Sequence, residues 1–280
     1  MQPELIEATH LLPHDRPPTF GEFQDVAHIL NGPPEIHRRE LGSVLDNLEA
    51  SSHVFDLAAQ QELSVFNGDS VHIRNADPGR IFVRAYAQYL AHALRLWGDL
   101  DEDPESARNF VRMLSAKIQK RDDRYLEGEA SSADIEPTLG GLFANVAAFD
   151  AQAHKSLDSV LLKLREEIAE LHEALGNLPL ELQQLRVPLR RRPPIQAWLS
   201  SRSPAETARL EKKDPIIGVL GEIGDITIIG ASLARLFGPS AEIHLRNALR
   251  EIELQVQKKH HEKGTLMSPQ PNFGALSVTA

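Results

Sequence analysis

The sequence has no cysteine among its 280 residues, which excludes disulfide bonds and metal sites built on thiolates. Aromatic residues are also scarce, at 5% of the chain, while leucine, alanine and glutamate are abundant, and this balance favours helix. Positive charge is in deficit: the formal net charge is −10, which argues against stable binding of nucleic acid. A hydrophobic fraction of 41% is sufficient for a real core, so we expect an all-α fold.

Targeting and membrane signals are also missing. The first residues, Met1 to Leu5, lack the basic and apolar regions of a signal peptide. One apolar run, from Pro215 to Phe237, is long enough to cross a membrane. Glu222 and Asp225 lie near its centre, however, where each carboxylate would be costly in lipid. We expect this run to be a buried helix of a cytoplasmic protein that binds no membrane.

The chain divides into two parts by pattern. Residues 1–130 show helical periodicity and no catalytic motif, and Asn67-Gly68 between two short β-prone runs predicts a small hairpin. This mostly helical N-terminal module is a candidate for binding another protein. A polar break before Pro137 predicts a boundary, followed by a second domain over residues 131–263. Residues 264–280 are expected to form a mobile tail.

Two pairs of carboxylates are the most informative feature of the sequence. Glu167 and Glu170 lie on a leucine-rich amphipathic segment, and Glu222 and Asp225 lie in the apolar run. A spacing of three residues places both members of a pair on one face of a helix. If the two helices pack together, four carboxylates converge, and a divalent cation such as Mg²⁺ would relieve their repulsion. Two plainer interpretations stay open: a solvated face for the first pair, and a salt bridge to a buried arginine for the second.

The same acids carry a resemblance to a known family. Glu166-Glu167-x-x-Glu170 followed by Glu222-x-x-Asp225 resembles the signature of the MazG-type nucleotide pyrophosphohydrolases, within the all-α NTP pyrophosphohydrolase superfamily. The segment Leu162–Arg165 before the first motif and Leu233–Gly238 after the second are similar in context. The resemblance covers about residues 145–263, less than half of the chain. It departs from the family in the long interval between the motifs.

The resemblance implies a MazG-like helical bundle that hydrolyses nucleoside triphosphates, NTP or dNTP, to the monophosphate and pyrophosphate. The implied cofactor is Mg²⁺, for which Mn²⁺ could substitute, and the implied metal ligands are Glu167, Glu170, Glu222 and Asp225. A homo-oligomer is also implied, and the apolar core helices, which looked too few to cover each other within one subunit, point the same way.

Other residues have implied roles around the acids. Glu166 is the candidate for orienting or deprotonating the attacking water, although it could equally form a solvated pair with Lys163. The family's Asn and Lys on its last helix have no clean counterpart here, and Asn247 and Arg250 lie nearest to them. The candidates for binding the substrate are Lys163, Asn247 and Arg250.

A non-catalytic function is the alternative. The long interval, the missing Lys and the N-terminal module all fit a regulatory protein that senses nucleotides or binds a partner, for example in a stress response or in phage defence. The intact acids favour catalysis, because a protein that only binds nucleotide has no need of all of them.

Two further charged stretches need an interpretation. Arg186–Lys213, between the motifs, has eight basic side chains and only two acidic ones, so it is either a phosphate-binding strap or a solvated loop that pairs with the acidic N-terminal module. The acids of Asp99–Asp103 lack the spacing of a calcium loop, and we expect them to be a solvated helix cap.

Overall fold

The computed structural model describes residues 19–21, 41–63, 80–101, 105–125, 138–153, 156–185, 194–201, 204–235 and 241–262. Helices make up 91% of this part and no strand occurs in it, so the all-α prediction is confirmed. An isolated bridge between Thr19 and Thr138 is its one extended pairing. The predicted hairpin and the predicted tail lie outside the described residues.

The helices follow one another along the chain, with short caps at the ends of the two that carry the acids. Ser156 accepts a hydrogen bond from the backbone N–H of Ser159 at 3.2 Å, and Asp214 accepts one from Ile216 at 3.0 Å. The bounds are α2 Leu41–Leu63, α3 Arg80–Leu100, α4 Ser106–Tyr125, α5 Leu139–Ala153, α6 Leu157–Gly176, α7 Leu180–Gln183, α8 Ile195–Leu199, α9 Pro204–Lys213, α10 Pro215–Ala234 and α11 Ala241–Glu262.

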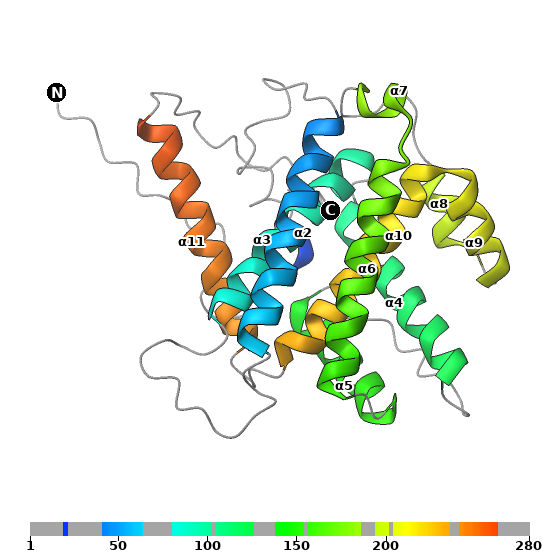
Figure 1. The fold of residues 1–280 in the computed structure, drawn as a ribbon, viewed down its shortest axis with the longest axis horizontal. Helices are drawn as coiled ribbons and strands as arrows, with labels where there is room; N and C mark the ends of the chain where they lie inside the picture. The colour runs from blue at the N-terminus through cyan, green and yellow to red at the C-terminus, as the bar shows by residue number, and fades with distance from the viewer. Residues whose placement is uncertain are drawn as a thin grey trace, which may run out of the picture.

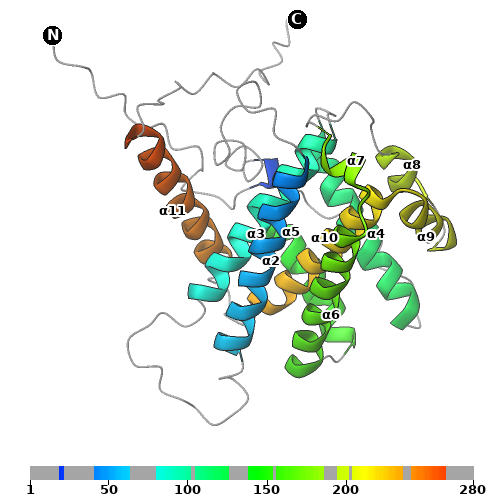
Figure 2. The ribbon, with the colours of Figure 1, turned by 45° about the horizontal axis from the view of Figure 1, so that its top comes forward.

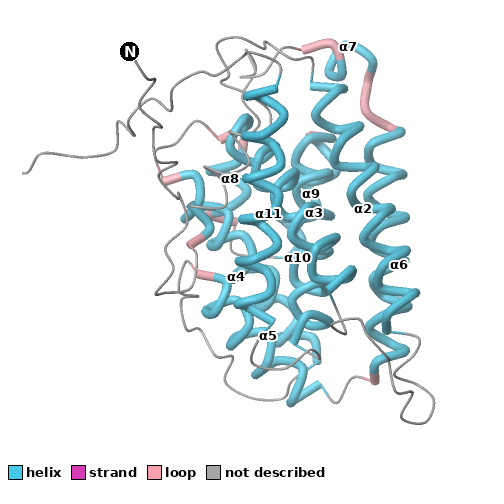
Figure 3. Tube along the Cα trace, turned by 90° about the vertical axis from the view of Figure 1, so that its left-hand side faces the viewer, coloured by secondary structure: helices cyan, strands magenta, loops and turns pink. Residues whose placement is uncertain are grey.

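Four helices that are distant in sequence form the centre of the fold. Helix α2 packs against α3 and α6, and α10 packs against the same two helices, so the four close into a bundle (Figure 1). Viewed from the side, these helices run alongside one another (Figure 3). Helix α11 packs on α3, on the side of the bundle away from α6 (Figure 2).

Helix α10 is the most enclosed element, because α4, α5 and α9 also pack on it. Fifteen of its twenty residues are buried. Among the described residues it is the one helix long and apolar enough to cross a membrane, and 78% of that window is buried inside the fold. Its covering comes from the same chain. The argument for an oligomer from uncovered core helices was therefore wrong, and the oligomer stays a prediction from the resemblance.

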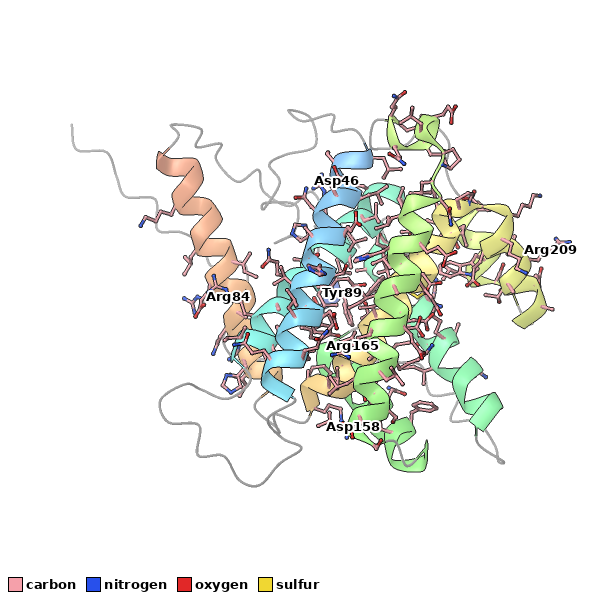
Figure 4. The ribbon with its side chains drawn as sticks, in the orientation of Figure 1. Asp46, Arg84, Tyr89, Asp158, Arg165 and Arg209 are labelled. Carbon is pink, nitrogen blue, oxygen red and sulfur yellow. The ribbon has the colours of Figure 1, made fainter. Side chains whose placement is uncertain are left out.

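A cluster of aromatic rings joins α2 and α3 and fixes α10 beside them. Phe55 stacks on Tyr86 and Tyr89, with ring centroids 5.2 and 5.8 Å apart. Tyr86 donates a hydrogen bond to the backbone oxygen of Thr227 at 2.7 Å, and Tyr89, seen between α2 and α6 in Figure 4, donates to that of Ile223 at 3.3 Å. Burial raises the pKa of both tyrosine hydroxyls, so they remain protonated donors. These bonds hold the part of α10 that carries the acid pair.

One hydrophobic core includes helices from both sides of the predicted boundary at residue 131. Leu48 and Trp97 belong to the same cluster of buried residues as Leu171 and Leu220. The two-domain division stays a prediction, but its two parts share this core.

The acids at the end of α3 are a correction to the sequence analysis. Asp99 and Asp101 are each only 7% exposed, whereas we expected a solvated cap. Arg95 donates to Asp99 at 2.9 Å and Asn109 donates to Asp101 at the same distance. The expectation failed because partners from one turn earlier on α3 and from α4 compensate the buried charge.

Candidate metal site

Three of the four predicted metal ligands converge between α6 and α10. Glu167, Glu170 and Glu222 each offer a carboxylate oxygen, and these oxygens all lie within 4.8 Å of one another. Glu167 is buried, Glu222 is half-buried and Glu170 is exposed, so the group opens to solvent on one side. Leu164, Ile168 and Leu171 bury one stripe of α6 in the core, and Glu167 lies beside that stripe.

Glu222 is the carboxyl of the site whose ionisation is disfavoured by its surroundings. Its Oε2 oxygen is buried and accepts no hydrogen bond from the residues that the structure describes. Burial, followed by the negative charges of Asp225, Glu167 and Glu170, raises the pKa of Glu222 to about 8, although the ammonium of Lys117 acts in the opposite direction. Without a cation, the carboxyl therefore retains its proton at neutral pH.

Asp225 is not part of this group of three, because it is held by a lysine from α4. The Nζ atom of Lys117 lies 2.5 Å from Oδ2 of Asp225, and the two side chains are only 13% and 19% exposed. The plainer interpretation of the second acid pair, a buried salt bridge, is therefore present for Asp225, with a lysine in place of the expected arginine.

Lys117 reaches this position across two glycines of α10. A Cβ on Gly224 would lie 2.9 Å from Cδ of Lys117 and 2.3 Å from the sulfur of Met113, so α4 can approach here only because Gly224 has no side chain. Burial lowers the pKa of Lys117, but Asp225, which it hydrogen-bonds, together with Glu211 and Glu222 more than reverses this, and the pKa is raised overall. The ammonium therefore stays charged.

The sequence analysis missed Lys117, although a signal was present. Phe110, Met113, Leu114 and Lys117 follow the spacing of one buried helical face, and a lysine on such a face requires a buried anion.

Glu166 and Lys163 lie at the open side of the group. Lys163 contacts Glu166 at 3.1 Å and Glu167 at 3.0 Å through its Nζ atom. Lys163 and Glu166 are 45% and 49% exposed, so the solvated pair considered for Glu166 is present. Burial lowers the pKa of Lys163, but its hydrogen bonds to Glu167 and Glu166, together with the charges of Glu167 and Glu170, more than reverse this. The pKa is raised overall, so the side chain stays cationic beside the carboxylates.

Asn247 and Arg250 are not brought to the acids. Both lie on α11, where Asn247 is exposed. Leu245, Ala248 and Ile252 bury one stripe of this helix, and α11 packs on α3, away from α6. The register of the last helix follows that stripe, so neither residue lies beside the acids of its own chain, and their binding of substrate stays a prediction.

In the described part of the basic interval Arg186–Lys213, the side chain that lies near the site is an acid, Glu211. Arg190–Arg192 lie outside the described residues, and Arg209 lies exposed at the outer edge of α9 (Figure 4). Glu211, on the same helix, turns inward. Its Oε1 atom accepts a hydrogen bond from Nε1 of Trp198 at 3.3 Å, and it would lie 3.3 Å from a Cβ on Gly221.

Comparison of the chain with models of protein families, with curated proteins and with solved structures gives no match in any of the three. The resemblance to the MazG-type enzymes therefore depends on the two motifs.

Proposed function

We propose that this protein is a divalent-cation-dependent nucleoside triphosphate pyrophosphohydrolase. The observation that supports this most strongly is the convergence of Glu167, Glu170 and Glu222 from two helices. A buried oxygen of Glu222 also has no hydrogen-bond partner in the described part of the chain. A protein gains nothing in stability from such an arrangement, because each carboxylate raises the cost of ionising the others.

The donor set suits a hard cation. In the part of the chain that the structure describes, the donors are three carboxylates with no sulfur or imidazole ligand, and such a set favours Mg²⁺, with Mn²⁺ as a substitute. A bound Mg²⁺ would lower the pKa of a coordinated water and neutralise phosphate oxygens. Glu167 and Glu222 would hold it from the buried side, and Glu170 from the side open to solvent.

The remaining roles belong to the residues at the open side. Lys163 is placed to contact a phosphate oxygen of the nucleotide, because its ammonium is half-exposed beside Glu167. Once Lys163 turns to the phosphate, Glu166 is released from the pair and can accept a proton from the attacking water. Cleavage between the α- and β-phosphates would yield a nucleoside monophosphate and pyrophosphate.

A second candidate is binding without turnover, as in a regulatory protein. The pairing of Glu166 with Lys163 supports it, since the group assigned to the water is half-exposed and already engaged. Nucleotide binding in the presence of Mg²⁺ with no product after prolonged incubation would favour this candidate. The cytoplasmic location, the homo-oligomer and a partner protein for the N-terminal helices remain proposals.

Pyrophosphate release from a panel of NTPs and dNTPs with Mg²⁺ or Mn²⁺ tests the proposed activity. We expect turnover by the wild type and a loss of at least about 100-fold in Glu222→Gln, which keeps the shape of the side chain but cannot ionise. The matched control is Glu173→Gln, an exposed acid of α6 outside the group of three, and it should retain the wild-type rate. Equal activity in Glu222→Gln and the wild type would refute the proposed site.

A further inference from the structure

The part of the site around Asp225 already contains a cation, and that cation belongs to the chain. Lys117 extends from α4 across the glycines of α10, and its ammonium lies 2.5 Å from Asp225. It is 13% exposed, so the surrounding helices and not solvent determine its position.

More than one carboxylate faces this ammonium. Lys117 Nζ and Glu211 Oε1 lie 3.7 and 3.3 Å from the same point, the place where a Cβ on Gly221 would stand. Asp225, which accepts the hydrogen bond of Lys117, and Glu211 both raise the pKa of the ammonium, and Asp225 contributes more. Carboxylates from α9 and α10 therefore lie near one buried positive charge, at a place that favours a cation.

Glu222 takes part in both groups. It offers an oxygen to the cluster with Glu167 and Glu170, and it also interacts with Lys117 and Asp225. The site therefore has two adjacent positions that favour positive charge. Lys117 fills one of them, and among the described residues the buried Oε2 atom of Glu222 has no hydrogen-bond partner.

We propose that the Lys117 ammonium takes the place of a second divalent cation, so that the site binds one metal ion per chain, between Glu167, Glu170 and Glu222. This inference builds on the proposed function, because it assumes that those three carboxylates bind a cation. A tethered ammonium neutralises Asp225 at all times, whereas a second metal ion would have to be recruited from solution. Through this contact α4, which precedes the acid motifs in sequence, determines how many ions the site accepts.

The test counts bound Mn²⁺ per chain, by electron paramagnetic resonance of the free ion and by calorimetry. The wild type should bind one ion, and Lys117→Met should bind two, because the uncharged thioether fills a similar volume and leaves Asp225 without a cation. The matched control is Lys163→Met, which removes a lysine from the exposed side of the same cluster and should still bind one ion.

The outcomes separate this inference from the proposed function. If the wild type and Lys117→Met both bind one ion, the proposed role of Lys117 is wrong and the metal site itself stands. The same conclusion follows if the wild type binds two ions. A wild type that binds no Mn²⁺ at millimolar concentration removes the proposed function itself.

A second measurement guards against misfolding of Lys117→Met. In protein labelled with ¹⁵N-lysine, the ammonium resonance of Lys117, assigned with the Lys117→Arg variant, should persist when Mg²⁺ saturates the site. Loss of the resonance on adding Mg²⁺ would show that the metal displaces Lys117 from Asp225, and would overturn the inference.

Discussion

At Glu222, folding and the proposed function have opposite effects: the fold disfavours the ionised carboxylate, and metal binding requires it. The packing of α10 buries it, and three neighbouring carboxylates oppose its ionisation, so its pKa is raised to about 8. In an unfolded chain the same carboxyl would ionise near its ordinary value of 4.5. The folded protein therefore binds a proton at neutral pH that the unfolded chain does not.

The sign of the resulting pH dependence follows from this difference. The contribution of Glu222 to stability is fully present below about pH 4.5 and is lost as the pH rises through about 8. In EDTA at pH 9, Glu222→Gln should melt higher than the wild type by about 2–4 °C, because its amide cannot ionise. At pH 5 the two should melt within about 1 °C of each other. Differential scanning calorimetry at both pH values measures this.

Mg²⁺ should reverse the order. At pH 8 and saturating Mg²⁺ the wild type gains stability from binding and Glu222→Gln does not. A difference in Tm between the two proteins that stays the same at pH 5, at pH 9 and with Mg²⁺ would contradict the assignment of Glu222 to a metal site.

The sequence predicted which acids would meet better than it predicted their partners. The spacing within each acid pair is a local property of a helix, and the resemblance of the two motifs to the MazG-type enzymes implied that the pairs would meet. The partner of Asp225 is Lys117, which lies 108 residues away along the chain, and such a contact depends on tertiary packing. The position of Asn247 away from the acids of its own chain depends on tertiary packing in the same way, since Leu245, Ala248 and Ile252 set the packing of α11 on α3.

At the scale of the element, α10 depends on its glycines as much as on its apolar residues. Gly224 admits the side chains of Met113 and Lys117, and Gly230 admits the ring of Tyr86. Each glycine lowers helix propensity by about 1 kcal/mol relative to alanine. The helix accepts this cost because the close approach allows α3 and α4 to cover it.

Replacing Gly230 by alanine tests this account of α10. The new Cβ would lie 2.3 Å from Cε2 of Tyr86, a fully buried ring whose hydroxyl is bonded to the same helix, so the ring cannot move aside easily. We expect Gly230→Ala to lower the free energy of unfolding by about 1–3 kcal/mol, despite the gain in helix propensity. Urea unfolding followed by circular dichroism measures the change.

Gly218→Ala is the matched control in the same helix. Its Cβ would meet the backbone oxygen of Glu211 at 3.4 Å, an ordinary contact, so helix propensity should dominate. Its free energy of unfolding should be unchanged or higher by up to about 1 kcal/mol. Equal destabilisation by both substitutions would show that the contact with Tyr86 is not the cause.

Helix positions could be predicted well because their signals are local. The apolar run from Pro215 to Phe237, for example, predicted a buried helix, and it corresponds to α10, Pro215–Ala234. The burial of Asp99 and Asp101 could not be predicted in this way, since a run of acids looks the same in sequence whether it is solvated or bonded to Arg95 and Asn109.

At the scale of the whole molecule, the helices that carry the acids are covered by helices that precede them in the chain. Helix α2 packs on α6, and α3 and α4 pack on α10. The sequence suggested a boundary near residue 131 because a polar segment occurs there, and polarity alone does not reveal whether the helices on either side share a core. The shared core could therefore be recognised only from the structure.

A fragment of residues 138–262 tests whether the second part can fold alone. Without α2, α3 and α4, the fragment would expose the faces of α6 and α10 that these helices bury. We expect it to lack a cooperative thermal transition and to bind an apolar dye such as ANS, as loosely packed states do. A cooperative transition with native near-ultraviolet circular dichroism would instead establish two independent domains.

The central claim is that the carboxylates of α6 and α10 support hydrolysis between the α- and β-phosphates of a nucleotide. Phosphorus NMR of a panel of NTPs and dNTPs incubated with the full chain and Mg²⁺ tests it most directly, because the spectrum identifies the bond that breaks. We predict nucleoside monophosphate and pyrophosphate in equal amounts from at least one nucleotide, and no such products with Glu222→Gln. Nucleoside diphosphate and inorganic phosphate as the products, or identical spectra for the wild type and Glu222→Gln, would contradict the claim.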